Sequence, residues 1–335
     1  MNSIWLRKYL PRIIVAIIAM CGILSLGLYL HTKQNYLHVL CSNNYESCAA
    51  LVESYEQHTE TKVKLVRLPT SKALDKLTAS ASTPEFDVFI GGPAEAYERA
   101  RKLDLIQPHQ LQTSADPRFS TEYWIGTYGG ILAFCIDPKH IDPQFAPHSW
   151  QELISAELSR SIALPSPLSS GTAATMLDTI KAIYPNERDF VQYLRQLHQN
   201  TLTYTDSGTN LVDLVADGRA SIAVTFAPYC QSFKARQMQT IYPKDGTSYE
   251  IGAAAIVKGG DFAAAQKFLK FAVSDSGQAL VASIENQNPI SANLPNNLAD
   301  SLAQLDLPVM NVNATESSLH REWLMRTFAR EVLYE

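Results

Sequence analysis

The sequence lacks the motifs that mark most enzyme active sites. It contains no G-x-S-x-G elbow, no H-E-x-x-H pair, no P-loop and no G-x-G-x-x-G fingerprint. Its eight histidines are scattered, and none is paired at the spacing of metal ligands. No segment brings a nucleophile together with a base. We therefore predict a protein that is not an enzyme and that uses no cofactor and no metal ion.

Basic residues are also few, and they form no run. The chain has 28 Lys and Arg against 33 Asp and Glu. Residues 1–31 hold three of the basic side chains and none of the acidic ones, so residues 32–335 carry 25 basic against 33 acidic side chains, a net charge of −8. A net acidic chain without basic runs is poorly suited to nucleic acid. An anion site would have to be built locally, from helix ends and a few side chains.

Only one long apolar run is present, at the N-terminus. Three basic residues precede an uncharged run of eighteen residues, 13–30, which is close to the thickness of a bilayer. No A-x-A cleavage site follows it, and Cys21 lies in the middle of the run in a poor lipobox. We predict that residues 1–31 are a signal anchor or signal peptide, with a lipoprotein signal as a third alternative. Each would place residues 32–335 in the periplasm or on the outer face of the cytoplasmic membrane, anchored there by residues 13–30 if uncleaved.

The exported part contains four cysteines: Cys41, Cys48, Cys135 and Cys230. An even number in an oxidising compartment allows two disulfides with three possible pairings. Cys41 and Cys48 are close in sequence, at the end of a predicted strand and in the next helix, so we favour this pair. The other two fit a second disulfide or two buried thiols equally well. No C-x-x-C is present, so neither a thioredoxin-like site nor a zinc site is indicated.

Strand and helix patterns alternate along the chain. The first half reads as strands at 36–40, 62–68 and 87–90 and helices at 45–58, 71–80 and 94–102. The middle repeats this order, with strands at 161–164, 202–204 and 221–226. Such alternation predicts parallel sheets with helices on both faces, and ligands then bind beyond the carboxyl ends of the strands.

The alternation predicts an α/β fold with two lobes. Two long strands, 130–136 and 249–257, flank the middle block and are expected to cross between the lobes. The predicted boundaries are 36–130 with 250–300 for lobe 1, 131–249 for lobe 2, and 301–335 for a C-terminal helical segment that packs on the lobes. In its last helix, four residues have the spacing of a core-facing stripe: Leu319, Trp323, Phe328 and Val332.

Loops rich in hydroxyl groups precede four of the predicted helices. They lie at 41–45, 69–71, 168–172 and 205–209, each after a predicted strand. Helix N-termini attract anions through free N–H groups and the helix dipole, although Ser and Thr are also the favoured N-caps. Four such loops on one rim favour a binding site over capping alone. The candidate residues are Ser42, Asn43, Thr70, Ser71, Ser169, Ser170, Gly171, Thr172, Thr205, Ser207 and Gly208.

Five further residues are candidates by their positions. Gly92 follows a buried strand, Tyr128 precedes the first crossing strand, and Tyr229 follows the strand at 221–226. Tyr249 and Glu250 begin the second crossing strand. A carboxylate at that place suits a sugar or amine donor better than a phosphate.

Four segments resemble a known family: YWIGTYGGILAFCID (123–137), PSPLSSGT (165–172), YTDSGTNLVDLVADGRASIAV (204–224) and YEIGAAAIVKGG (249–260). They are similar to type 2 periplasmic solute-binding proteins of ABC importers, in the ferric-iron-binding-like branch that includes 2-aminoethylphosphonate and hexose-phosphate binders. The resemblance extends from about residue 37 to about residue 295. It implies two α/β lobes, joined by two hinge strands, that close on a ligand without covalent chemistry.

The resemblance also bears on the ligand. Iron binders of this branch use adjacent tyrosines, whereas this chain has no Tyr-Tyr pair and reads APYCQ at 227–231. The S-S-G-T and T-D-S-G-T strings match the positions that hold phosphate or phosphonate oxygens in organophosphate-binding relatives. Pro228 and Tyr229 stand where hexose-phosphate binders often have a His-Asp pair, so the sugar contacts differ.

The resemblance implies a small anionic solute, a phosphate ester or a phosphonate. Its phosphoryl group would lie at Ser169–Thr172, with Thr205, Ser207 and Gly208 opposite and Ser42–Asn43 supplied by the other lobe. The implied partner is an ABC permease. A membrane sensor kinase, read through a tethered receptor, is the alternative partner, and ferric iron or a polyamine is the alternative ligand.

Overall fold

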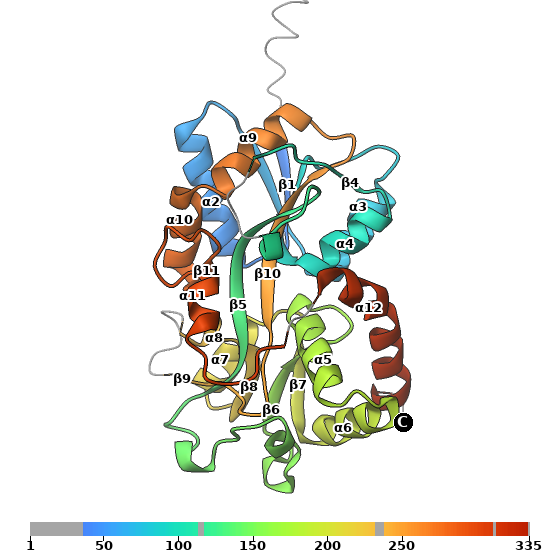
Figure 1. The fold of residues 1–335 in the computed structure, drawn as a ribbon, viewed down its shortest axis with the longest axis vertical. Coiled ribbons are helices and arrows are strands. Elements are labelled where there is room, and N and C mark those ends of the chain that lie inside the picture. Colours follow the sequence, from blue (N-terminus) through green and yellow to red (C-terminus); the bar gives the residue numbers. More distant parts are fainter. Residues whose placement is uncertain (1–35, 113–116, 232–237, 311–312, 334–335) are drawn as a thin grey trace, which may run out of the picture. The chain divides into compact units, whose positions relative to one another are not determined.

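The computed structural model describes residues 36–112, 117–231, 238–310 and 313–333 (Figure 1). The strands are β1 (Leu37–Cys41), β2 (Val63–Arg67), β3 (Val88–Pro93), β4 (Ile106–Gln107), β5 (Ile125–Ile136), β6 (Ile162–Pro165), β7 (Thr201–Thr205), β8 (Ile222–Phe226), β9 (Gln239–Ile241), β10 (Tyr249–Val257) and β11 (Asn288–Pro289). The helices are α2 (Tyr45–His58), α3 (Thr70–Ala79), α4 (Ala94–Lys102), α5 (Gly171–Ile183), α6 (Glu187–Asn200), α7 (Asn210–Ala216), α8 (Ala227–Cys230), α9 (Phe262–Ala272), α10 (Asp275–Glu285), α11 (Leu298–Ala303) and α12 (Ala314–Phe328). A π-helical turn, Ala329–Leu333, extends α12.

The strands of residues 37–333 form one mixed sheet with two parallel halves. Its main path is β2-β1-β3-β10-β5-β8-β6-β7. Strands β1, β2 and β3 are parallel in one half, and β6, β7 and β8 are parallel in the other. Between them β10 and β5 run antiparallel, as the two long strands that pass through the middle of Figure 1. The predicted α/β fold with two crossing strands is confirmed.

Strand β5 connects the two halves and is longer than expected. It begins at Ile125, five residues before the predicted start at 130, and all of its residues are buried. Its first part pairs with β10, and its second part pairs with β8 and β9. The sequence pattern places the start of this strand too late because of the three glycines at 126, 129 and 130, since glycine is rare in strand interiors and more typical of loops. Here they admit close neighbours, such as the Leu298 side chain against Gly129.

Each half of the sheet has its own core. One cluster gathers Phe134, Trp150, Phe190 and other residues between 132 and 241. Two clusters cover the faces of the other half, one around stacked Phe89 and Tyr97 and one around Tyr55 and Phe268. Separate cores are the property that lets two lobes move as units. The exact lobe boundaries remain a proposal.

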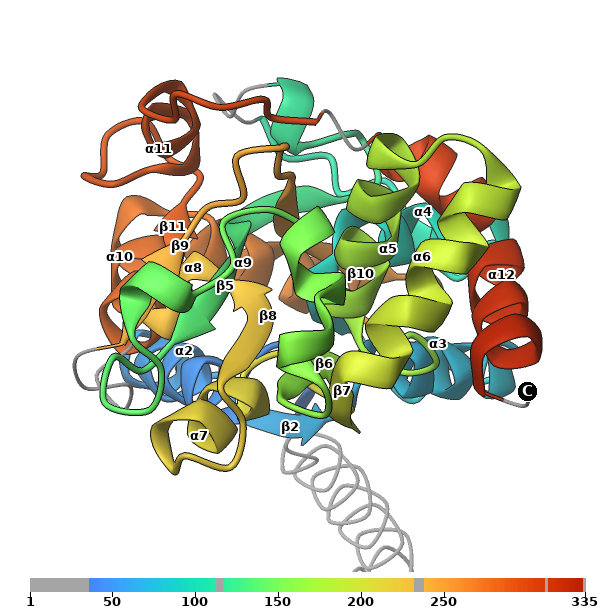
Figure 2. The same ribbon diagram turned by 90° about the horizontal axis from the view of Figure 1, so that it is seen from below.

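The C-terminal helix α12 packs on both lobes, against α4 of one and against α5 and α6 of the other (Figures 1 and 2). Phe328 and Val332 lie in the core as predicted, and Trp323 packs at its edge. The prediction for Leu319 is wrong, since this side chain is 64% exposed. The buried face instead includes Arg321, a charged residue that hydrophobic periodicity does not place in a core.

Two disulfides are present. Cys41 is bonded to Cys48, which confirms the favoured pair. Cys135 is bonded to Cys230, so these two cysteines form a second disulfide and are not buried thiols. The first joins the end of β1 to α2, and the second joins β5 to α8. Both flank the loops from which the cleft is built. The predicted anchor at 13–30 lies outside the described residues, and within the described part of the chain no helix is both long enough and apolar enough to cross a membrane.

Candidate functional site

The carboxyl ends of the parallel strands in both lobes meet at one small cavity. Its volume is about 30 Å³, and it is enclosed by loops that follow β1, β2, β3, β6, β7 and β8. Of the predicted residues it is lined by Ser42, Asn43, Thr70, Gly92, Tyr128, Ser170, Gly171, Thr172, Ser207, Gly208, Tyr229 and Glu250. All four hydroxyl-rich loops therefore contribute to one cleft between the lobes.

Four predicted residues do not line this cavity. The Ser169 hydroxyl donates to Asp206 Oδ1 at 2.5 Å, and the Ser71 hydroxyl donates to the Ser169 carbonyl at 3.3 Å, so both act at the rim. Thr205 turns back and donates to the Ser207 carbonyl at 2.7 Å. Tyr249 lines a different cavity. Thr205 bonds within its own loop, as hydroxyls near a helix start often do, whereas Ser71 and Ser169 bond to neighbouring loops that are distant in sequence.

Helix α5 begins at the cleft without a side-chain cap. Ser170 is its N-cap residue and is 2% exposed, yet its side chain makes no cap bond. The first N–H groups of an α-helix have no partner within the helix, and they lie at its positive end. In α2, by contrast, Asn44 accepts from the Glu46 N–H as an ordinary cap. The capping explanation therefore holds for the loop at 41–45 and fails for PSPLSSGT.

Arg67 is a lining residue that the sequence analysis did not identify. It is the last residue of β2, and its Nε donates to the Asn43 carbonyl at 3.1 Å. Asn44, Asp206 and Thr209 also line the cavity and were not identified. The position of Arg67 in the sequence could have identified it, because a basic residue at the carboxyl end of a parallel strand lies where ligands of such sheets bind.

One buried hydroxyl in the cleft lacks a partner. Ser42 Oγ is buried and makes no hydrogen bond within the described chain. A buried polar atom without a partner costs about 1–3 kcal/mol, so such an atom calls for an explanation in the function of the site.

Gly92 and Tyr128 form the floor of the cavity. The strand β3 does not end before the glycines as predicted but continues to Pro93, with Gly91 and Gly92 at positive φ. The Gly92 N–H donates to the Tyr128 hydroxyl at 3.1 Å. A Cβ on Gly92 would lie 2.9 Å from Thr70 Oγ1, so this position requires glycine both for its backbone conformation and for space.

A side-chain network joins the lobes at the back of the cleft. Gln287 exchanges two hydrogen bonds with the Asn43 side chain, at 2.9 and 3.1 Å. Its Nε2 also donates to the Tyr229 hydroxyl at 3.3 Å. Gln287 is 2% exposed and follows α10 in lobe 1, whereas Tyr229 belongs to α8 in lobe 2. Tyr229 is thereby oriented by a residue of the opposite lobe.

Glu250 is buried between the lobes. It is 7% exposed, and one of its oxygens accepts from the Thr175 hydroxyl of α5 at 3.4 Å. Burial raises the pKa of Glu250 to about 8. At neutral pH its carboxyl group is therefore mainly protonated and can act as a hydrogen-bond donor.

Arg321 of α12 supports the PSPLSSGT loop from behind. It is 4% exposed, and its Nη2 donates to the carbonyls of Pro167 at 2.9 Å and Ser170 at 3.3 Å. These bonds fix the backbone just before α5. The PSPLSSGT loop is thus held by a helix that also packs on lobe 1.

A wider cavity of about 400 Å³ adjoins the inner one. The two share Asn44, Arg67, Thr209 and Tyr229. The wider cavity adds the mainly polar residues Tyr45, Glu46, Asn210, Val212, Asp213, Ile284 and Glu285. Together they form a cleft with a narrow inner end and a wider mouth that both polar and apolar side chains line. Within the described residues, no group of three or more His, Cys, Asp or Glu is placed to hold a metal ion.

Two α/β lobes with a polar cleft between them and two crossing strands define a periplasmic-type solute-binding protein. The chain belongs to the family described as bacterial extracellular solute-binding protein, whose model matches residues 37–283. Proteins of this family bind small solutes and deliver them to ABC permeases, and they are not catalytic. The resemblance seen in the sequence is confirmed at this level.

Individual known proteins share this fold or part of the sequence. An uncharacterised protein of Haemophilus influenzae is 27% identical over 258 residues, which cover 73% of this chain and 74% of that protein. The periplasmic binding protein AfuA of Actinobacillus pleuropneumoniae, solved with fructose-6-phosphate, is 23% identical with a TM-score of 0.80, over 90% of this chain and 99% of that one. A ferric binding protein of Campylobacter jejuni is 17% identical with a TM-score of 0.75, over 88% and 99%. At these identities the solved structures establish the fold and leave the solute open.

Proposed function

We propose that this protein captures a small phosphorylated or phosphonate solute in the interlobe cleft and delivers it to an ABC permease. The observation that carries the proposal is the start of α5. Its N-cap Ser170 makes no side-chain cap bond, and Ser170, Gly171 and Thr172 all line the inner cavity. Free N–H groups at the positive end of a helix form a site suited to phosphoryl or phosphonyl oxygens.

Other groups around the inner cavity favour the same kind of ligand. Arg67 adds a positive charge, and the Ser42 hydroxyl can donate to an anion oxygen. Glu250 would repel an anion if it were ionised, but its pKa of about 8 keeps it mainly neutral at pH 7. Asp206 also lines the cavity and offsets the charge of Arg67, so the anion would be held mainly by the free N–H groups at the start of α5 and by hydroxyl donors.

The cleft also has room for an organic part. The inner cavity of about 30 Å³ is too small for a sugar, so the organic part would lie in the adjoining mouth of about 400 Å³. Amide, carboxylate and tyrosine side chains such as Asn210, Asp213 and Tyr45 line that mouth, a composition suited to hydroxyl groups. The solute bound in AfuA is a hexose phosphate, which is the same combination of groups.

Ligand binding would close the two lobes, and a partner protein would recognise the closed conformation. We propose an ABC permease as this partner and residues 13–30 as a tether to the membrane. A membrane sensor kinase could instead recognise the closed conformation. Measuring uptake of the solute in cells that lack this protein distinguishes transport from sensing. Loss of uptake indicates transport, whereas normal uptake with lost induction of a response indicates sensing.

A thermal-shift screen of the full-length protein, stripped of ligand by refolding, tests the solute class. The panel would contain inorganic phosphate, phosphonates, hexose phosphates, phosphoglycerates, ferric iron and polyamines. A ligand that binds only the folded state raises the melting temperature. At a free ligand concentration of 100 times Kd, the free energy of unfolding increases by about 2.7 kcal/mol. We expect phosphorylated or phosphonylated compounds to raise the melting temperature and ferric iron to leave it unchanged. A shift with iron or a polyamine alone would contradict the proposal.

A further inference from the structure

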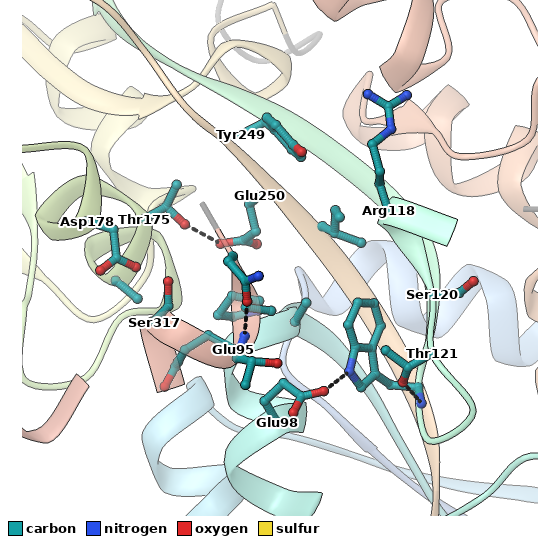
Figure 3. Close-up of a pocket in the computed structure, with 18 residues that line it drawn as sticks. Glu95, Glu98, Arg118, Ser120, Thr121, Thr175, Asp178, Tyr249, Glu250 and Ser317 are labelled. Atoms are coloured by element: carbon teal, nitrogen blue, oxygen red, sulfur yellow. Dashed lines mark hydrogen bonds between the residues drawn. The ribbon is translucent and has the colours of Figure 1, made fainter. Parts of the chain in front are cut away.

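A second cavity, of about 290 Å³, lies between α4, α5, β10 and the beginning of α12 (Figure 3). It shares only Pro93 and Glu250 with the lining of the inner ligand cavity. Its walls come from both lobes and from the C-terminal helix. A molecule bound there would contact all three parts.

Carboxylates dominate the charge of this cavity. Glu95 and Glu98 of α4, Asp178 of α5 and Glu250 of β10 line it, and they surround the same space in Figure 3. Among the lining residues Arg118 carries the one full positive charge, and Figure 3 shows its guanidinium group directed away from the four carboxylates. The centre of the cavity is therefore rich in carboxyl groups, of which Glu98 is paired with Arg101 and Glu250 is mainly protonated at pH 7.

Three of these carboxylates have hydrogen-bond partners in the protein: Asp178 accepts from Ser317, Glu250 accepts from Thr175, and Glu98 has two partners. Glu98 bonds to Arg101 at 3.0 Å and accepts from Trp124 Nε1 at 2.8 Å. Glu95 differs, because it is only 6% exposed and its Oε1 makes no hydrogen bond within the described chain. The guanidinium nitrogen Nε of Arg99 is 3.7 Å from that oxygen, beyond hydrogen-bond distance. A buried carboxylate oxygen on the wall of a cavity is thus left without a donor.

The nearby positive charges do not compensate for burial. Glu95 is attracted by Arg321, by Arg99, with which it forms an ion pair at 3.7 Å, and by Lys102. Asp178 is attracted by Arg321 and His320, and the Nη2 of Arg321 is bonded to the carbonyls behind the PSPLSSGT loop. Burial outweighs this attraction and raises the pKa values of Glu95 and Asp178 as well as that of Glu250. Buried carboxylates of this kind are stabilised when a cation with several N–H donors is placed among them.

We propose that this cavity is a second binding site, for a small organic cation that carries a primary ammonium group. The ammonium group would donate to Glu95 and Asp178, the carbonyl oxygen of the protonated Glu250 would be a further acceptor, and the organic tail would pack near Trp124 and Tyr249. A metal ion is disfavoured, because no metal-holding group of His, Cys, Asp and Glu occurs among the residues that the structure describes. The inference is independent of the solute proposed for the interlobe cleft.

Calorimetric titration of the full-length protein at pH 7 and fixed ionic strength tests the site. The probes are ethylamine, propylamine and putrescine, and the matched neutral probes are ethanol, propan-1-ol and butane-1,4-diol. We expect saturable one-to-one binding of at least one amine and no binding of the alcohols. Failure of all three amines to bind would overturn the proposal.

Variants locate the amine. Glu95→Gln should weaken its binding about tenfold or more. Asp178→Asn, at a half-buried position, should act in the same direction and serves if the first variant does not fold. Arg67→Ala in the interlobe cleft and Glu322→Gln at an exposed ion pair should leave binding unchanged. Wild-type affinity in both the Glu95 and Asp178 variants, or a change only with Arg67→Ala, would overturn the assignment.

Discussion

Gly171 at the start of α5 lies directly against Pro93 at the end of β3. A Cβ added to Gly171 would lie 2.6 Å from Pro93 Cδ and 2.9 Å from Thr70 Oγ1. Gly171 follows a strand of one sheet half, whereas Pro93 and Thr70 belong to the other. The closed arrangement of the cleft therefore depends on the absence of a side chain at residue 171.

Gly171→Ala should hinder closure without harming the fold. Alanine is favoured over glycine in a helix by up to about 1 kcal/mol, so the ligand-free protein should keep its melting temperature. Solute affinity should fall about tenfold or more, as measured by calorimetry with the best compound of the screen. Leu168→Ala, an exposed change in the same loop, is the control and should bind normally. Unchanged affinity in Gly171→Ala would show that the lobes need not approach this closely.

Arg67→Gln should weaken binding of an anionic solute. Hydrogen bonds to charged groups contribute about 1.5–3 kcal/mol, which corresponds to about ten- to a hundredfold in Kd. The loss should be larger at low salt, because the interaction is electrostatic. Arg219→Gln removes an exposed arginine paired with Asp217 and should have no effect. Equal affinities for the two variants would exclude Arg67 from the site.

Glu250→Gln should change how stability depends on pH. The pKa of Glu250 is raised from 4.5 to about 8 in the folded state, so between these values the folded protein holds a proton that the unfolded chain releases. The wild type should therefore lose stability as the pH rises from 5.5 to 8, by about 3 kcal/mol more than the variant. Urea unfolding at several pH values measures the free energy of unfolding of both proteins. The contributions of the other titrating groups cancel in the difference between them. Parallel curves for the two proteins would contradict the raised pKa.

Arg321→Ala should lower both stability and solute affinity. It removes the donor to the carbonyls of Pro167 and Ser170 and leaves the buried Glu95 and Asp178 less compensated, at a cost of about 3 kcal/mol or more. Arg321→Lys keeps a charged donor and should restore part of both properties. If Arg321→Ala lowers the melting temperature but leaves solute affinity unchanged, the arginine supports the fold and does not position the loop.

The alternation of strands and helices predicts much of the fold. It also predicts that the loops at 41–45, 69–71, 168–172 and 205–209 meet, because the carboxyl ends of parallel strands share an edge. The disulfide of Cys41 with Cys48 follows from their spacing. These features depend on local pattern and on general topology, which a single sequence contains.

Other features depend on tertiary contacts that the pattern does not contain. The sequence shows Arg67 at the end of a predicted strand, but its contact with the Asn43 carbonyl is evident only when β2 is placed beside β1. Leu319 has helical core spacing, yet α12 is rotated so that Arg321 faces the lobes. Gln287 belongs to no motif and joins the site only through Asn43 and Tyr229. In each case the partner residue, distant in sequence, decides the role.

A crystal structure of the full-length protein with the best solute of the screen tests the central claim most directly. We predict that the phosphorus atom lies within about 4 Å of the N–H nitrogens of Gly171 and Thr172, with Arg67 in contact and the organic part in the wider mouth. A solute bound with its organic end at α5, or with its anionic group away from Gly171, would contradict the account.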